Sequence, residues 1–154
     1  MKTILLPLNL DSNTMKLFEY ALPMAVKLEA TLVLLHVVRK QSYDNGTFAP
    51  DTGVHQRMVQ EVRLILDQLS RRAISYGVRS KIIILDGNPV DTVLNTAKTH
   101  QVDMIILSHN EQNENSLSSR IQNLSSCPIL TWQSDNSINR LIKSKPSTGL
   151  SCPV

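Results

Sequence analysis

Five apolar runs, separated by segments of helical periodicity, constrain the fold of this chain more than any other feature. The runs lie at residues 3–6, 31–38, 79–85, 102–108 and 127–132. Those at 3–6, 31–38 and 102–108 show almost no alternation of apolar and polar side chains, which is typical of strands buried on both faces of a parallel sheet. Because parallel strands need crossover connections, helices must cover both faces of that sheet. The sequence therefore predicts an α/β fold with one five-stranded parallel sheet.

The segments between the runs carry the expected helical patterns. Pro23 falls inside the first pattern and predicts a kink or a break, and Gly77 is the predicted end of the longest helix, at about 54–76. Shorter helices are predicted after Pro89 and before residue 124. The predicted buried face of the first helix is Met15, Phe18, Leu22, Ala25 and Leu28. The predicted apolar stripe of the longest helix is Met58, Val62, Ile65, Leu69, Ala73 and Tyr76.

Composition restricts the classes of partner. With 154 residues, 42% of them hydrophobic and 19% charged, the chain is typical of one soluble domain, assigned to residues 1–132. It shows neither a membrane-length apolar run nor a signal peptide, so we expect a cytoplasmic protein. Of the net charge of +3, the polar tail at 133–154 carries Arg140, Lys143 and Lys145 against Asp135, which leaves +1 elsewhere. Aromatic residues are only 4%, so nucleic-acid binding is not predicted.

Cysteine and histidine give no sign of a metal site or a disulfide. Cys127 and Cys152 are the two cysteines, and both are expected to be reduced in the cytoplasm. The histidines, at positions 36, 55, 100 and 109, have no metal-ligand spacing with them. His36 and His109 belong to one predicted edge of the sheet but lack an evident partner carboxylate or nucleophile. No catalytic residue is assigned, and no enzyme activity is predicted.

The stretch 102–132 has the strand–loop–helix–strand order of a nucleotide site, but its loop lacks the residues that bind a phosphate. Residues 109–115 read His-Asn-Glu-Gln-Asn-Glu-Asn, without the glycines that let backbone N–H groups approach a phosphate. Glu111 and Glu114 would each repel an anion by about 1 kcal/mol if solvated near 4 Å. The alternative is a small-anion site in which Ser108, Ser116 and neighbouring polar side chains surround the helix N-terminus.

Five motifs, in order, give the chain its resemblance to a known family. They are Lys2-Thr3-Ile4-Leu5-Leu6-Pro7-Leu8, Leu35-His36-Val37, Gly87-Asn88-Pro89, Asp103-Met104-Ile105-Ile106-Leu107 and Ser126-Cys127-Pro128-Ile129-Leu130. Over residues 1 to about 132 the chain resembles the universal stress protein family. The resemblance implies a Rossmann-like sheet of the adenine nucleotide alpha hydrolase type, in order 3-2-1-4-5, and a cytoplasmic homodimer.

The ATP-binding motif of that family is degraded here. ATP-binding members carry Gly-x-x-Gly, nine residues and then Gly-Ser or Gly-Thr; this chain has Ser108 at the first glycine, a shortened loop and Asn115-Ser116 at the end. Asn9 stands where the resemblance implies an aspartate. The chain is therefore similar to the branch that lacks the glycine motif, and no cofactor is expected, with ATP disfavoured. The candidate nucleotide-edge residues are Pro7, Leu8, Asn9, Val37, Leu107, Ser108, His109, Asn115, Ser116, Leu117 and Ser118.

The last strand is the candidate dimer interface, formed by Ile129, Leu130, Thr131 and Trp132. An edge strand leaves N–H and C=O groups open, and pairing with its own copy would satisfy them. The alternative is that Trp132 packs on the core of its own subunit. The expected function is a role in the stress response through homodimerisation and protein contacts, without ATP binding; the alternative is a stress protein that binds ATP, AMP or a small anion through a degenerate loop.

Overall fold

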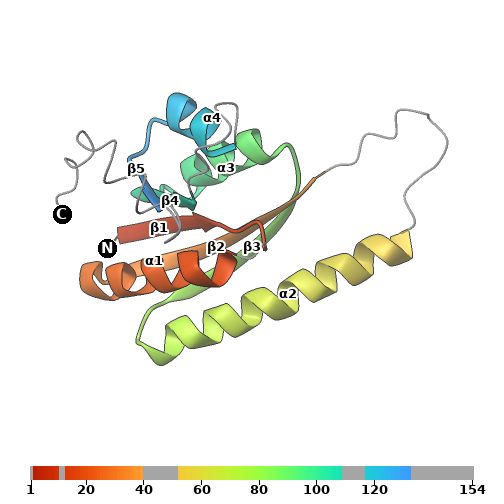
Figure 1. Ribbon diagram of the computed structural model, residues 1–154, viewed down its shortest axis with the longest axis horizontal. Coiled ribbons are helices and arrows are strands. Elements are labelled where there is room, and N and C mark those ends of the chain that lie inside the picture. The colour runs from red at the N-terminus through yellow and green to blue at the C-terminus, as the bar shows by residue number, and fades with distance from the viewer. Residues whose placement is uncertain (1, 11–12, 40–51, 109–116, 133–154) are drawn as a thin grey trace, which may run out of the picture.

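The computed structural model describes residues 2–10, 13–39, 52–108 and 117–132. Strands and helices alternate throughout, as predicted (Figure 1). The elements are β1 (Lys2–Pro7), α1 (Thr14–Leu28), β2 (Ala30–Arg39), α2 (Thr52–Ser75), β3 (Ser80–Gly87), α3 (Pro89–Thr99), β4 (Met104–Ser108), α4 (Leu117–Leu124) and β5 (Ile129–Trp132).

The five strands form one parallel sheet in the order β3-β2-β1-β4-β5, which confirms the predicted fold class and strand order. Leu5, in the middle of β1, is paired with Val33 of β2 on one side and with Ile105 of β4 on the other. β1 is therefore the strand from which the chain first builds outward to β3 and then crosses over to β4 and β5. The order of the strands reverses at β1, and in such sheets ligands bind at the carboxyl ends of the strands beside that point.

Two layers of helices enclose the sheet (Figure 1). Helices α1 and α2 cover one face, where the even-numbered residues of β1 and β2 meet Phe18 and Leu66. Helices α3 and α4 cover the other face, where Leu5, Val93 and Ile121 belong to a second cluster. Both sides of the central strands are buried, and this is why the apolar runs in the sequence lack alternation.

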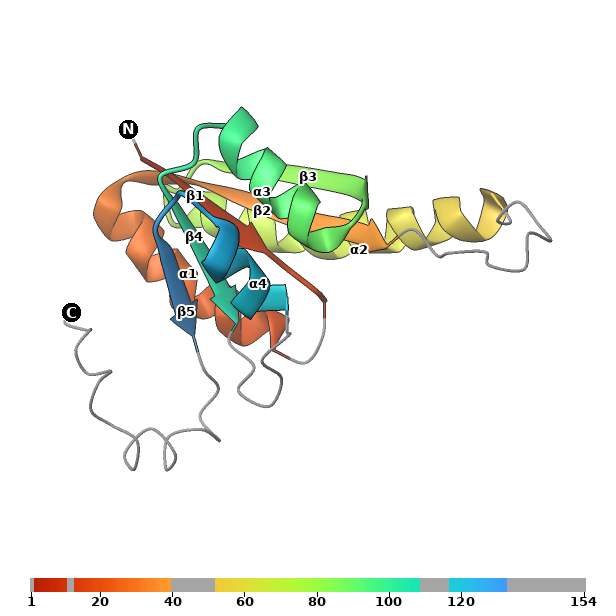
Figure 2. The same cartoon turned by 90° about the horizontal axis from the view of Figure 1, so that it is seen from above.

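The buried side of α2 differs from the predicted stripe. Val62, Leu69 and Ala73 are buried as predicted, but Leu66 is fully buried where Ile65 was expected. Met58, Ile65 and Tyr76 are exposed, because α2 is rotated on the sheet relative to the predicted stripe and its first turns extend past the ends of the strands (Figures 1 and 2).

Helix α1 departs from its predicted face at both ends. Phe18, Leu22 and Ala25 are buried, whereas Met15 and Leu28 are exposed. The predicted break at Pro23 does not occur, since α1 is continuous from Thr14 to Leu28. Pro23 lies on the exposed side of the helix, where water can reach the carbonyl that loses its helical donor.

Candidate functional site

The carboxyl ends of β1, β2 and β4 bring together the described candidate residues of the nucleotide edge. Pro7 ends β1, Val37 lies near the end of β2, and Leu107 and Ser108 end β4. Helix α4 begins on the same edge of the sheet (Figure 2). The topology therefore places these positions at one edge of the sheet.

Leu8 is held at this edge by two hydrogen bonds to its backbone groups. Its N–H donates to the carbonyl of Leu35 at 2.8 Å, and its carbonyl accepts from Nδ1 of His36 at 2.8 Å. Because a carbonyl only accepts, Nδ1 must carry a proton in this bond. The Leu8 side chain is buried in the core between the sheet and α1. Leu8 and His36 thus fix the exit of β1; the sequence placed His36 at this edge but did not reveal its bond.

The apolar candidates at this edge have structural roles. Leu107 is buried against the α3–α4 layer, and Val37 packs against the same cluster. Ser108 is half-buried and remains in the strand ladder, opposite Trp132 of β5. In the described part of the chain the non-glycine residues with positive φ are Leu10, Glu29 and Gln101, so Ser108 does not adopt the left-handed conformation that favours glycine.

The turn between β1 and α1 has unusual local geometry. Asn9 is exposed, and Leu10 has a φ of 61°, a left-handed conformation that is costly for leucine. Thr14, the first residue of α1, is buried, and its Oγ1 has no hydrogen-bond partner. The sequence indicates neither the left-handed conformation of Leu10 nor the missing hydrogen-bond partner of the Thr14 hydroxyl. Both depend on how the rest of the chain packs around these residues.

Several candidates lie outside the described residues. His109, Asn115 and Ser116 belong to this group, as do the predicted loop before α2 and the tail after residue 132. Leu117 and Ser118 form the first turn of α4. The polar candidates His109, Asn115 and Ser116 are therefore assigned from the sequence alone.

The candidate dimer strand β5 lies at one edge of the sheet. The side chains of Leu130 and Trp132 pack against the α1 side, where the Trp132 ring is 6.5 Å from that of Tyr20, and Ile129 packs against the α3–α4 side. Thr131 is paired with Leu107 of β4. The apolar side chains of β5 are thus half-buried against the two clusters of this chain, and among the described residues no strand is paired with the outer edge of the β5 backbone.

The amino ends of β1, β4 and β5 carry a second polar cluster, which the sequence did not reveal. Asp103 accepts a hydrogen bond from the Thr3 N–H through Oδ2 and donates its own N–H to the Thr3 carbonyl, both at 2.8 Å. The Cys127 thiol donates to the Val102 carbonyl at 3.5 Å. Burial, and then the negative charge of Asp103, raise the pKa of the Cys127 thiol above its ordinary value of 9.0. A neutral, hydrogen-bonded thiol is a poor nucleophile.

Among residues 2–10, 13–39, 52–108 and 117–132, no three His, Cys, Asp or Glu side chains are grouped so that they could hold a metal ion. The helices described there include none that is both long and apolar enough to cross a membrane.

Comparison with known proteins decides the family. The model of the universal stress protein family matches residues 1–131. The chain belongs to the universal stress protein family. Universal stress protein YxiE of Bacillus subtilis is 26% identical over 129 residues, which cover 75% of this chain and 87% of YxiE.

Solved structures of universal stress proteins share the fold. A family member from Burkholderia pseudomallei aligns with a TM-score of 0.73 at 18% identity, covering 86% of this chain and 96% of that one. Universal stress protein UspA from Lactobacillus plantarum aligns with a TM-score of 0.72 at 20% identity, covering 84% and 96%. At these identities the likeness establishes the architecture of this universal stress protein and not its ligand.

Proposed function

We propose that this universal stress protein acts in the stress response through homodimerisation and protein contacts, without binding ATP. The observation that carries the proposal is the chemistry of residues 108–116, which contain no glycine and include Glu111 and Glu114. A triphosphate needs closely approaching backbone N–H groups, and non-glycine residues restrict that approach. We further infer a cytoplasmic protein without enzymatic activity, composed of the domain at 1–132 and the tail.

The open edge of β5 supports the dimer. The Ile105 N–H donates to the Pro128 carbonyl at 3.0 Å, and Ile105 is paired with Ile129. In a parallel ladder this register directs the N–H groups of Leu130 and Trp132 toward β4 and those of Ile129 and Thr131 toward the open edge. A second copy of β5 can therefore pair with Ile129 and Thr131 while the ladder to β4 stays intact.

Thr131→Pro tests the dimer. Proline removes the outward N–H of Thr131, and an edge strand tolerates proline where its N–H faces away from the neighbouring strand. We expect Thr131→Pro to sediment as a monomer at concentrations where the unmodified chain and the control Thr131→Val, which keeps the N–H, sediment as dimers. A dimeric Thr131→Pro variant, or a monomeric unmodified chain, would refute pairing through β5.

A second candidate function is binding of a nucleotide or small anion through the degenerate loop. It is favoured by two fold neighbours, a universal stress protein solved in complex with cAMP and one from Archaeoglobus fulgidus solved in complex with dAMP, which share 14% and 11% identity with this chain. The hydroxyl of Ser116, next to the start of α4, is the group this candidate depends on. It predicts a ligand that survives purification and is detected by mass spectrometry, and that is lost in Ser116→Ala.

A further inference from the structure

The outer edge of β5 presents the backbone groups of every second residue. Ile129 and Thr131 direct both their N–H and their C=O groups away from β4, whereas Leu130 and Trp132 direct theirs toward it. The side chains alternate as well, since Leu130 and Trp132 pack on the α1 side of the sheet and Ile129 packs on the α3–α4 side. A strand added at this edge can therefore bond only to Ile129 and Thr131 of β5.

The position before Pro128 is closed to such pairing. If the alternation of β5 is continued backward, Cys127 is the next outward position, two residues before Ile129. The Cys127 N–H donates to Oγ of Ser125 at 3.0 Å, and the same hydroxyl donates to the Cys127 carbonyl at 3.0 Å. Because both backbone groups of Cys127 are already bonded, the open part of this edge begins at Ile129.

Symmetry restricts how two copies of this edge can pair. Identical edges related by a two-fold axis perpendicular to the sheet run antiparallel, and each hydrogen-bonded pair joins two outward residues. An axis beside Ile129 places Thr131 opposite Cys127 of the partner subunit, whose backbone groups are already bonded. An axis beside Thr131 places Ile129 opposite residue 133, which lies outside the described residues. Of the residues that the structure describes, each of these registers pairs only one outward residue, and pairs it with itself.

An axis beside Leu130 pairs both outward residues. Ile129 then lies opposite Thr131 of the partner subunit, and Thr131 lies opposite Ile129 of the partner subunit, so the N–H and C=O groups of both residues are satisfied. Leu130 lies opposite its own copy in a non-hydrogen-bonded pair, in which the Cα atoms are about 4.5 Å apart and the side chains are closest. Because Leu130 is only half-buried in its own subunit, this pairing removes further apolar surface from water.

The same register brings Trp132 to Pro128 of the partner subunit. Pro128 is exposed and directly precedes β5, so the alternation of the strand places it on the side of Leu130 and Trp132. Trp132 is half-buried. Contact between the indole ring and the proline ring covers apolar surface at both ends of the paired strands.

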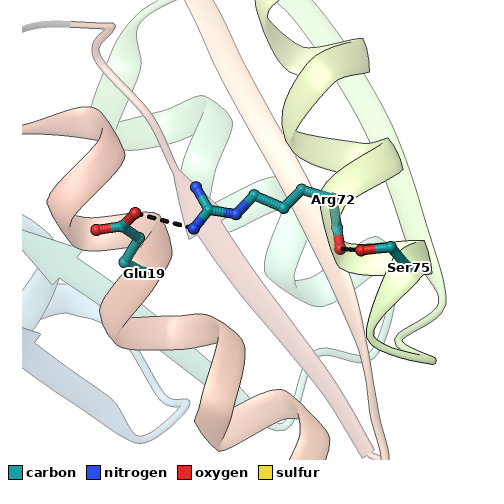
Figure 3. Close-up of polar contacts among 3 residues, drawn as sticks. All are labelled: Glu19, Arg72 and Ser75. Carbon is teal, nitrogen blue, oxygen red and sulfur yellow. Dashed lines mark hydrogen bonds and ion pairs between the residues drawn. The ribbon is translucent and has the colours of Figure 1, made fainter.

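The Trp132 ring is supported from its own subunit. It lies 6.5 Å from the ring of Tyr20 on α1. Helix α1 is linked in turn to α2 by the ion pair of Glu19 and Arg72, whose side chains lie 3.0 Å apart (Figure 3). The indole ring is therefore positioned by contacts within its own subunit, and a partner has only to meet it.

We propose that two copies of this chain pair antiparallel through β5 with the two-fold axis beside Leu130. Leu130 then meets Leu130 of the partner subunit, and Trp132 meets Pro128 of the partner subunit. The inference rests on the proposed homodimer, and it adds the register of the two strands and the side chains that meet.

Single cysteines along β5 measure the register in the full-length dimer. In a Cys127→Ala, Cys152→Ser background, we expect Leu130→Cys to form a covalent dimer on oxidation with copper phenanthroline, because the two copies of this position lie within the about 4.4–6.8 Å between Cα atoms that is usual for a disulfide. Ile129→Cys and Thr131→Cys are the matched controls. Each lies on a diagonal of about 7–8 Å from its own copy and should stay uncrosslinked. The double variant Ile129→Cys, Thr131→Cys should cross-link, because these two positions face one another.

Other patterns overturn the register. A covalent dimer of Ile129→Cys alone, or of Thr131→Cys alone, would place the axis beside that residue. If neither Leu130→Cys nor the double variant cross-links while the unmodified chain sediments as a dimer, this antiparallel pairing is refuted and the homodimer is not. A monomeric unmodified chain would instead refute the proposed homodimer itself. Sedimentation of each variant under reducing conditions verifies that it still folds and associates, and the double variant decides the register if Leu130→Cys does not.

Discussion

The surroundings of Cys127 are formed by residues that lie far apart in the sequence. Its thiol lies beside Val102 and Asp103, which precede β4, and Asp103 in turn binds Thr3 at the start of β1. The sequence supports the expectation of a reduced thiol but not its neighbours, because they meet only where three strands begin side by side. Cys127 is consequently held neutral in an environment that no spacing along the chain reveals.

Asp103→Asn should make Cys127 more reactive toward iodoacetamide. The substitution removes the negative charge that helps to raise the thiol pKa, while the amide oxygen can still accept from the Thr3 N–H. In a Cys152→Ser background, which leaves Cys127 as the sole cysteine, we expect alkylation at pH 8 to accelerate by up to about fivefold, the factor for the interaction of about 1 kcal/mol between two solvated unit charges about 4 Å apart. An unchanged rate would show that Asp103 does not influence the thiol.

The raised pKa of the Cys127 thiol should also change how the free energy of unfolding depends on pH. Since the folded chain raises the thiol pKa above 9.0, the contribution of the neutral thiol to stability is complete below pH 9.0 and is lost as the pH rises through the folded pKa. We expect the free energy of unfolding, measured by urea denaturation, to fall more steeply above pH 9 than in Cys127→Ala. Parallel curves for the two proteins would contradict the assigned pKa direction.

At the scale of elements, two helices end with the same hydrogen-bond pattern but with different residues. After α2 the Val78 N–H donates to the Ala73 carbonyl and Gly77 has a φ of 82°; after α3 the Val102 N–H donates to the Ala97 carbonyl and Gln101 has a φ of 51°. This is the Schellman arrangement, which favours glycine at the left-handed position. The cap at Gly77 was predicted, whereas Gln101 gives no such signal in the sequence.

Substitutions at the left-handed positions of these two helix ends should change the free energy of unfolding in opposite directions. Gly77→Ala should lower the free energy of unfolding by about 1 kcal/mol, the cost of a left-handed conformation with a Cβ atom. Gln101→Gly, at an exposed position, should raise it by about 0.5 kcal/mol, because relief of that cost exceeds the added entropy of the unfolded chain. Urea midpoints at constant m-value measure both, and a destabilised Gln101→Gly would contradict the argument.

The buried side of α2 shows that helical periodicity alone does not determine which residues face the sheet. Spacings of three or four residues allow either Ile65 or Leu66 to continue the face begun by Val62, and the structure buries Leu66. The rotation of a helix on a sheet is set by side chains of other elements, here those of β2 and β3, which the pattern along α2 does not contain. The residue range of α2 was therefore predicted well, but the rotation of α2 about its own axis on the sheet was not.

At the scale of the whole molecule, the fold was predicted on two different grounds. Uninterrupted apolar runs alternating with amphipathic segments were sufficient for a parallel sheet covered on both faces. The order β3-β2-β1-β4-β5 was implied by the family resemblance, and the strand pairing confirms it. The same topology explains why Pro7, Val37 and Ser108 meet at one edge, while the bond between His36 and Leu8 depends on side-chain directions that topology leaves open.

We propose that this universal stress protein retains the scaffold of its family but does not bind a triphosphate. Thermal unfolding of the purified full chain with and without ATP and Mg²⁺ tests it most directly. We expect no change in the unfolding temperature as the nucleotide concentration rises. A concentration-dependent stabilisation, reaching about 2.7 kcal/mol at a hundredfold excess over Kd, would contradict it.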